Sequence, residues 1–476
     1  MVDSKGVEKD GKQKFNVPTT FVLFGGTGDL SRKKLFPSLF DLYRKGRLPD
    51  AFHVIGVAHT DHDVDSFRLL IAEHLVGDQE QQQDFLERVT YVRGSFDDMQ
   101  MYEDLEVHAA NIDDAVGQCT NKLFHLSVSP RFYEPLLTHL HKSGLAAPCD
   151  ADSGWTRVLI EKPFGNDLQS AQDLDGLLGR LFREEQIYRI DHYLAKETIQ
   201  NIIVFRFANV LFTPVWNDQH VEKIELTIHE KIDVDTRGRF YDGIGALRDV
   251  GQNHLLQMFS LIAMDNPGTF DAAHIRRQRA SVLERTIVDP LHKDSVQGQY
   301  AGYTDIEGVD SASQTETYFR LHAQIDSDKW RDTEFVLSAG KALSEKSTRI
   351  TVTLKEPDPC LCTMIEGSDG QKNQIIIDIQ PEEKITVRFY AKEHGFDDEI
   401  VPKDFTFSYH DDESSDNDEV DAYERVLYDA IVGDQMLFAS TEEVVAAWRV
   451  MMPVLEAWES EKPTIYPRGS QASDVE

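Results

Sequence analysis

Short runs of apolar residues alternate with helix-like segments over the first 190 residues or so. The run TTFVLFG at 19–25 ends in glycines, apolar residues follow at helical spacing between Leu35 and Tyr43, and a second run, HVIGVA, occupies 53–58. A buried strand, a glycine turn, a helix and another strand make a βαβ unit. Further strands are expected at YVRGSF near residue 91, KLFHLSV at 122–128 and TRVLIEKPFG at 156–165. This alternation predicts an α/β domain with a Rossmann-like, doubly wound parallel sheet.

The second half shows a different pattern, in which polar and apolar residues alternate one by one. VEKIELTIHEK at 221–231 is the first example, and TETYFRLHAQID, WRDTEFVLSAG, TRITVTL, NQIIIDIQ and KITVRFYA follow. Such strands predict a large, mainly antiparallel sheet with one covered face. The apolar segment 243–264 predicts a long helix. We therefore expect a flexible tail at 1–16, a dinucleotide-binding domain at 17–190, and an α+β domain for substrate binding and dimerisation at 191–476.

Charge and composition narrow the class of protein. The chain has 476 residues, with 83 Asp and Glu against 49 Lys and Arg, a formal charge of −34. This excess of acid argues against nucleic acid and anionic membranes as partners. No run approaches about 18 consecutive apolar residues, and the N-terminus lacks a secretory apolar core, so a cytoplasmic location is expected.

The four cysteines predict neither a disulfide scaffold nor a metal site. Cys360 and Cys362 form a C-x-C pair without a second pair at zinc spacing, and we interpret them as ordinary strand residues. The cysteine count therefore also favours a reducing compartment.

A glycine-rich turn follows the first predicted strand. Gly25, Gly26 and Gly28 would let backbone amides approach a pyrophosphate at the start of a helix. Thr27 and Leu30 stand where the fuller G-x-G-x-x-G pattern has glycines. A plain tight turn between strand and helix is the alternative.

The end of the second predicted strand bears on the choice of dinucleotide. An NAD-specific site usually places an acidic residue there, whereas this strand ends Val57-Ala58-His59-Thr60. The absence of an acid tolerates a 2′-phosphate, which His59 could contact. The alternative is that His59 is a surface histidine.

The stretch QIYRIDHYLAKE at 186–197 contains the highest density of side chains that could bind a ligand or take part in catalysis. We expect a strand leading into a helix that begins near Asp191, so that His192 and Lys196 are neighbours on one helical face. With the Tyr193 hydroxyl they would form a cradle for a phosphate group. A set of structural ion pairs explains the same residues equally well.

Two further positions are candidates for catalysis and binding. His254 lies on the long apolar helix, where it is either a buried core histidine or a general base. A general base needs an orienting partner, and Asp191 is a candidate. The motif EKPFG at 161–165 ends a predicted parallel strand where such sheets bind ligands, so Lys162 is a candidate ligand or an ordinary solvated lysine.

Taken together, GGTGDLSRKKLFP, EKPFG, RIDHYLAKE and RDVGQNHLLQM, in this order, resemble the glucose-6-phosphate dehydrogenase family over about residues 19 to 465. The resemblance implies a Rossmann-like domain followed by a β+α domain whose sheet makes a dimer or a dimer of dimers. It also implies oxidation of glucose 6-phosphate at C1 to 6-phosphogluconolactone with NADP or NAD, the first step of the oxidative pentose phosphate pathway.

The same resemblance assigns roles to individual residues. His254 would be the general base and Asp191 its partner. The implied substrate ligands are Lys162, Glu230 and Asp249 for the sugar, His192, Tyr193 and Lys196 for the phosphate, and the later lysines Lys341 and Lys346. The implied cofactor-binding residues are Gly25, Gly26, Thr27, Gly28, Asp29, Leu30, Lys34, His59, Thr60, Lys162 and Pro163.

The sequence departs from the family pattern at two positions. His59 stands where NADP-specific members typically carry arginine, so the chain is expected to use both cofactors or to favour NAD. Leu337 stands where members often have arginine, just before Lys341 and Lys346. Two alternatives for function are another Rossmann-type sugar oxidoreductase and a non-catalytic dinucleotide-sensing protein.

Overall fold

The computed structural model describes residues 17–148, 154–357, 372–396, 400–408 and 420–475. These residues belong to two units. The first comprises Met1–Gly165, Gln172–Ala195 and Glu419–Ala439, and the second comprises Asn166–Ala171, Lys196–Asp418 and Ser440–Glu476. The chain therefore passes between the units more often than a single boundary near residue 190 implies. The predicted tail at 1–16 and the Cys360–Cys362 pair lie outside the described residues.

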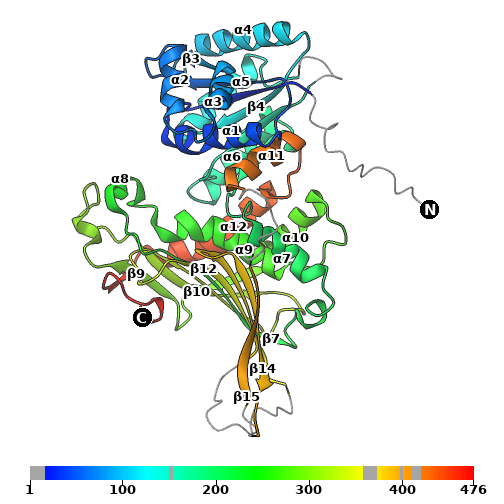
Figure 1. The fold of residues 1–476 in the computed structure, drawn as a ribbon. Helices are drawn as coiled ribbons and strands as arrows, with labels where there is room; N and C mark the ends of the chain where they lie inside the picture. The colour runs from blue at the N-terminus through cyan, green and yellow to red at the C-terminus, as the bar shows by residue number, and fades with distance from the viewer. Residues whose placement is uncertain (1–16, 149–153, 358–371, 397–399, 409–419, 476) are drawn as a thin grey trace. The chain divides into compact units, whose positions relative to one another are not determined.

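The first unit contains a seven-stranded sheet in the order β16-β6-β5-β4-β1-β2-β3 (Figure 1). Its strands are β1 (Thr19–Phe24), β2 (Phe52–Ala58), β3 (Val89–Arg93), β4 (Asn121–Leu126), β5 (Thr156–Ile160), β6 (Ile187–Ile190) and β16 (Phe438–Ala439). All neighbours are parallel except β16, which runs antiparallel to β6. Every residue of β1 and β4 is buried, as expected for central strands covered on both faces. The predicted doubly wound sheet is confirmed.

Helices connect these strands. They are η1 (Ser31–Leu35, a π-helix), α1 (Phe36–Arg44), α2 (Val64–Ala72), α3 (Gln79–Glu87), α4 (Met99–Val116), α5 (Tyr133–Lys142), α6 (Leu168–Leu181) and α11 (Ala422–Val432). The strand order reverses between β1 and β4, each of which has the other as one neighbour. In doubly wound sheets, ligands bind outside the carboxyl ends of the strands at this reversal.

The second unit contains a ten-stranded sheet. Along the sheet the order is β15-β14-β13-β12-β7-β11-β10-β9-β17, and β8 pairs with β10. The strands are β7 (Val221–His229), β8 (Thr286–Asp289), β9 (Val296–Tyr300), β10 (Tyr318–Ile325), β11 (Glu334–Gly340), β12 (Ser347–Leu354), β13 (Gln374–Gln380), β14 (Lys384–Lys392), β15 (Ile400–Ser408) and β17 (Thr464–Tyr466). Most pairs are antiparallel, which confirms the predicted sheet, but β7 runs parallel to β11 and β9 parallel to β17.

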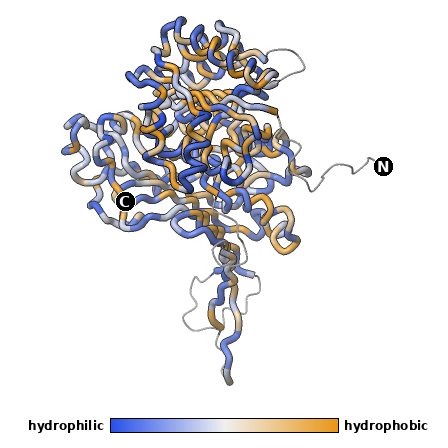
Figure 2. The backbone as a smooth tube through the Cα atoms, turned by 45° about the horizontal axis from the view of Figure 1, so that its top comes forward, coloured by the Kyte–Doolittle hydropathy of each residue, from blue (hydrophilic) through white to orange (hydrophobic). Residues whose placement is uncertain are grey.

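Helices cover one face of this sheet (Figure 1). The principal ones are α7 (Glu197–Phe207), η6 (Leu247–Leu255, a π-helix), α9 (Leu256–Ala263), α10 (Ala272–Glu284) and α12 (Thr441–Trp458). Phe259 of α9 packs edge to face on Phe335 of β11, with ring centroids 5.1 Å apart. Figure 2 shows hydrophobic segments concentrated inside each unit and hydrophilic segments on the loops. Among the described helices, none has the length and hydrophobicity that crossing a bilayer requires.

Three local features differ from the sequence predictions. The prediction of a helix that begins near Asp191 is wrong, because residues 192–195 form turns and α7 starts at Glu197. The Asp191 side chain accepts a hydrogen bond from the Tyr193 amide at 3.1 Å, a local bond that competes with helix formation. The helix predicted over 243–264 is present as η6 followed by α9, so its first part is π rather than α. Cys119, just before β4, is disulfide-bonded, which the cysteine count did not predict.

Candidate active site

The parallel pairing of β7 with β11 brings two chemically active side chains together. His229 is in register with Gly340, and the Glu230 amide donates to the Gly340 carbonyl at 2.9 Å. Glu230 and Lys341 are therefore the next residues at the same edge of the sheet. The Lys341 ammonium lies 2.5 Å from a Glu230 carboxylate oxygen.

A second carboxylate reaches the same lysine from η6. Asp249 Oδ2 lies 3.9 Å from Lys341 Nζ. The three side chains line a small cavity together with Ile228, Tyr241, Ala246, Val250 and Gly340. In this concave site the two carboxylates can accept hydrogen bonds from the hydroxyl groups of a ligand, and the ammonium can donate them.

The π-helical form of η6 affects which side chains share its surface. Hydrogen bonds in a π-helix join residues five apart, so residues at that interval stack along one side. Asp249 and His254 are five residues apart on η6. His254 is buried, with 1% of its surface exposed, and its backbone amide donates to Asn253 Oδ1 at 2.7 Å. Long π-helical segments are rare and are frequently found at functional sites.

The glycine turn after β1 has the form that a dinucleotide site requires. Gly25 has φ +81°, and a Cβ there would lie 2.1 Å from the Ser127 carbonyl oxygen. A Cβ on Gly26 would lie 2.9 Å from Gly56 Cα. The turn therefore needs glycine for close packing against β2 and the end of β4, and it lies at the reversal of strand order. These residues fit a pyrophosphate held by backbone amides.

Comparisons with known proteins agree over both units. Residues 22–201 match the family model described as "Glucose-6-phosphate dehydrogenase, NAD binding domain", and residues 203–475 match the one described as "Glucose-6-phosphate dehydrogenase, C-terminal domain". The chain belongs to the glucose-6-phosphate dehydrogenase family. The resemblance identified from the sequence motifs is thereby confirmed, and with it the class of NAD(P)-dependent oxidoreductase.

Individual relatives are similar over nearly the whole chain. The glucose-6-phosphate 1-dehydrogenase of Chlamydia pneumoniae is 36% identical, over 94% of this chain and 91% of the relative. That of Dictyostelium discoideum is also 36% identical, over 95% and 91%. A solved glucose-6-phosphate dehydrogenase in complex with its substrate glucose 6-phosphate has 31% identity and a TM-score of 0.90, covering 97% of this chain and 96% of the other.

The remaining predicted substrate residues of the family motif occupy several places. Asp191 follows β6 and is buried, with 3% exposed. The His192 ring is stacked on Tyr423, at 6.3 Å between centroids, and is also close to Tyr193. Lys196 immediately precedes α7. Asp191, His192 and Tyr193 belong to the first unit, whereas Lys196, Glu230, Asp249, His254, Lys341 and Lys346 belong to the second.

Two of the predicted lysines, Lys162 and Lys346, are not among the residues that line the cavity. Lys162, with Pro163, follows β5 and is partly exposed. Lys346 is exposed in the connection from β11 to β12, just before Ser347, which is in register with His229. Lys346 therefore leaves the sheet beside the strand that carries Glu230, but it is not among the residues that line the cavity.

Contacts are defined for several of the predicted cofactor residues. The Thr27 hydroxyl lies 3.1 Å from that of Thr60, which joins the turn to the segment after β2 that carries His59. Asp29 is paired with Arg32 and Lys33, and the pKa of its carboxyl is lowered by hydrogen bonds to Lys33 and Arg32. Lys34 pairs with Asp421 at 2.9 Å. Gly28 forms a bend, and Asp29 and Leu30 begin the helical segment that leads into η1.

Sequence reasoning missed two residues beside the cavity. Tyr241 lines it, and burial followed by the charge of Asp249 raises the pKa of its hydroxyl. Glu316 accepts a hydrogen bond from the Leu247 amide at 2.9 Å, at the first residue of η6. Burial raises the pKa of Glu316 to about 7. Neither residue lies in a recognisable motif, so the sequence alone carried no signal for them.

Proposed function

We propose that this chain oxidises D-glucose 6-phosphate at C1 to 6-phospho-D-glucono-1,5-lactone, with hydride transfer to NADP or NAD. This is the first step of the oxidative pentose phosphate pathway. The observation that carries the proposal is the convergence of Glu230, Asp249 and Lys341 on one cavity. The family resemblance assigns Glu230 and Asp249 to the sugar, and it names Lys341 as one of the later substrate lysines.

Binding of the sugar is assigned to this cavity. Glu230 and Asp249 accept hydrogen bonds from the sugar hydroxyls, and Lys341 offsets the repulsion between the two carboxylates. Lys162, which lies in the EKPFG motif at 161–165, is also assigned to the sugar. His192, Tyr193 and Lys196 are assigned to the phosphate, and the exposed Lys346 to the same anion. Phosphate contacts remote from C1 supply energy for positioning the reacting carbon.

Removal of the proton from the C1 hydroxyl is assigned to His254. A neutral imidazole accepts the C1 hydroxyl proton as the carbon is oxidised, and the Asp191 carboxylate stabilises the imidazolium that forms. Both side chains are buried, and charges that interact away from water do so more strongly. General-base assistance of this kind is typically worth about 10² to 10⁴ in rate.

The dinucleotide is assigned to the glycine turn. Gly25, Gly26, Thr27, Gly28, Asp29 and Leu30 would hold the pyrophosphate, with Lys34 beside them. His59 and Thr60 would contact the adenosine ribose, and Lys162 and Pro163 would border the nicotinamide. When bound, the nicotinamide supplies the hydride acceptor, while the residues of this chain bind, orient and move the proton.

The direct test is the initial rate at which reduced nicotinamide forms with glucose 6-phosphate or free glucose, and with NADP or NAD. We expect turnover with glucose 6-phosphate and a large loss with free glucose, which lacks the phosphate. Equal rates with both sugars would favour another sugar oxidoreductase. Tight dinucleotide binding without turnover of any sugar phosphate would favour a sensing protein.

We also propose a homodimer, or a dimer of dimers, formed through the α+β region at 191–476, with 17–190 binding the dinucleotide. A cytoplasmic location is proposed because a relative from Arabidopsis thaliana, 35% identical over 92% of this chain, is named as a cytoplasmic form. The disulfide at Cys119 is the observation against a reducing compartment. Sedimentation velocity of the full chain tests the dimer, and mass spectrometry of protein alkylated in the cell tests the thiol state of Cys119.

A further inference from the structure

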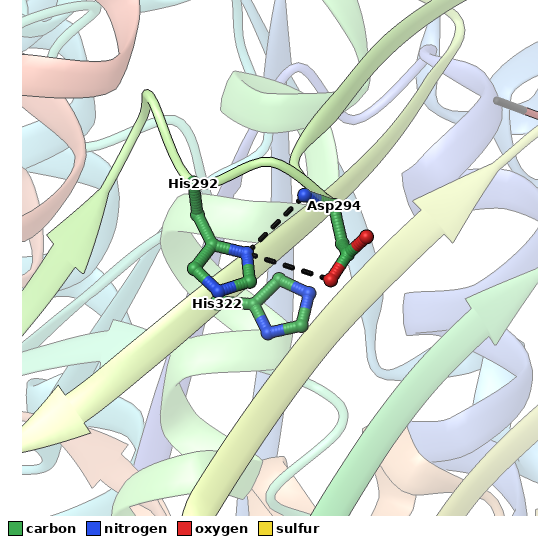
Figure 3. Close-up of side chains that lie close together, drawn as sticks. All are labelled: His292, Asp294 and His322. Carbon is green, nitrogen blue, oxygen red and sulfur yellow. Dashed lines mark hydrogen bonds and ion pairs between the residues drawn. The ribbon is translucent and has the colours of Figure 1, made fainter.

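A cluster of three metal-ligating side chains lies in the second unit, on residues that the proposed reaction does not use. His292 and Asp294 belong to the loop between β8 and β9, and His322 belongs to β10. One potential ligand atom from each lies within 4.8 Å of the other two. Figure 3 shows the two imidazole rings one above the other, with the Asp294 carboxylate beside both.

The cluster lies on the sheet face opposite the helices. Phe335 packs on α9, so its neighbour Glu334 projects from the other face. His322 is in register with Val336, two residues from Glu334, and therefore projects on the same side. Its Nδ1 lies 3.1 Å from a Glu334 carboxylate oxygen.

We propose that His292, Asp294 and His322 form a binding site for a divalent transition metal of the zinc class, with Glu334 orienting His322. Two imidazoles and one carboxylate, with a water molecule in the fourth position, are a ligand set that suits Zn²⁺.

The free nitrogen of His322 is the strongest argument for a ligand. Because Nδ1 contacts Glu334, Nε2 is the nitrogen left for a metal. Nε2 is buried and has no hydrogen-bond partner within the part of the chain that the structure describes. Leaving a buried polar atom unsatisfied costs free energy, which a metal–nitrogen bond would recover. A histidine held by a carboxylate through its other nitrogen is the usual arrangement at protein metal sites.

His292 also presents a lone pair toward Asp294. The Asp294 amide donates to His292 Nδ1 at 3.3 Å, so this nitrogen is unprotonated, as a metal ligand must be. Asp294 Oδ2 lies 4.0 Å from the same nitrogen. A metal would replace only this long hydrogen bond.

Hydrogen bonds hold the loop between β8 and β9 in place, while its exposed side chains can still move closer together. The Ser295 amide donates to the His292 carbonyl at 2.8 Å, and Arg320 Nε donates to the Asp294 carbonyl at 3.2 Å. Ligand atoms around zinc, each bonded at about 2.0–2.2 Å, lie roughly 3.3 Å from one another. The side chains must therefore close by about an ångström or more, a movement that the half-exposed His292 and Asp294 can make.

The test is a calorimetric titration of the chelator-treated full chain with ZnCl₂, repeated with Co²⁺ as a spectroscopic probe. We expect one equivalent of Zn²⁺ per chain. His292→Gln and His322→Gln should each lower affinity by about 100-fold or more, and Glu334→Gln by about tenfold, as expected for an outer-sphere partner. His274→Gln is the matched control, because His274 Nδ1 lies 3.0 Å from Asp271 outside this cluster.

Three outcomes would overturn the proposal: no saturable binding, several weak equivalents that His292→Gln leaves unchanged, or a loss in His274→Gln equal to that in His292→Gln. His322 is mostly buried, so His322→Gln is interpreted only if its circular dichroism matches the parent chain. His292→Gln, at a side chain 35% exposed, keeps the test decisive if the other variant misfolds.

Discussion

Lys341 lies between the two carboxylates of the cavity that we propose binds the sugar. It is in contact with the Glu230 carboxylate and close to that of Asp249, and its ammonium lies 5.6 Å from the centroid of the Tyr241 ring. The resemblance suggested Lys341 despite Leu337 at a position where family members often have arginine. Leu337 is fully buried within β11, so this departure affects the core of the sheet rather than the cavity.

His254→Asn should lower kcat by about 10² to 10⁴, because it removes the proposed general base and leaves the proposed sugar ligands in place. The KM for glucose 6-phosphate should stay within a few-fold of the parent value. Steady-state rates of nicotinamide reduction measure both constants. The exposed His220 provides the control as His220→Asn. Parental turnover in His254→Asn would remove this residue from the mechanism.

Glu316→Gln should change how stability depends on pH. The native pKa of Glu316 is about 7 against an ordinary 4.5, so between these values the folded chain holds a proton that the unfolded chain has released. The contribution of this group is fully present below pH 4.5 and is lost as pH rises through 7. Glutamine keeps an acceptor for the Leu247 amide but cannot ionise.

The stability of Glu316→Gln relative to the parent should therefore rise between about pH 5 and about pH 8, by up to about 3 kcal/mol. Thermal or denaturant unfolding at several pH values measures this difference. Glu345→Gln, at an exposed position, is the control. A difference for Glu316→Gln that stays constant with pH would contradict the assigned cause.

His59→Arg should raise kcat/KM for NADP relative to NAD, because arginine carries a permanent charge and a fork of donors for a phosphate. Paired assays with the two dinucleotides give the ratio. If His59→Gln leaves the ratio unchanged, His59 does not contact the 2′-phosphate.

At the scale of elements, η6 is held by side chains from distant parts of the sequence. Glu316 bonds to the first residue of η6, and Phe319 of β10 packs beneath Gly251, where a Cβ would lie 2.8 Å from the Phe319 ring. The apolar pattern of 243–264 predicts a helix correctly. It does not distinguish π from α, because that choice depends on tertiary contacts rather than on local periodicity.

Gly251→Ala should therefore destabilise the protein by about 1–3 kcal/mol through overpacking and should also lower kcat, since η6 carries Asp249 and His254. Gly179 in α6 is the matched control, because a Cβ there meets open space. Gly179→Ala should gain up to about 1 kcal/mol and leave activity unchanged. Denaturant unfolding measures both effects. Equal stability changes in the two variants would mean that η6 accommodates the extra methyl group.

The cavity shows what the sequence can and cannot predict at this scale. Strands β7 and β11 were both expected from their alternating residues, and both are present. Their parallel pairing was not expected, and this pairing joins Glu230 to Lys341, 111 residues later. Only the family resemblance linked these residues in advance, since no local pattern specifies which strands become neighbours.

At the scale of the whole molecule, the charge of −34 opposes compact folding through self-repulsion. Added NaCl screens this repulsion, with a Debye length that falls from about 30 Å at 0.01 M to about 8 Å at 0.15 M. The melting temperature should therefore rise across this range. The experiment uses a chloride salt, because sulfate strengthens apolar burial whatever the charge of the protein. A flat or falling melting temperature would show that repulsion is already offset locally.

The interleaving of the two units has a consequence for biosynthesis. Strand β16 completes the first sheet beside β6, and Glu424 of α11 forms an ion pair with Lys45 at 2.7 Å, so the first unit depends on residues that are translated long after β6. While the nascent chain is growing, the edge of β6 has no strand to cover it and can pair with other chains. A gene fragment encoding only the nucleotide-binding half would keep that edge open permanently, which favours aggregation over a usable isolated domain.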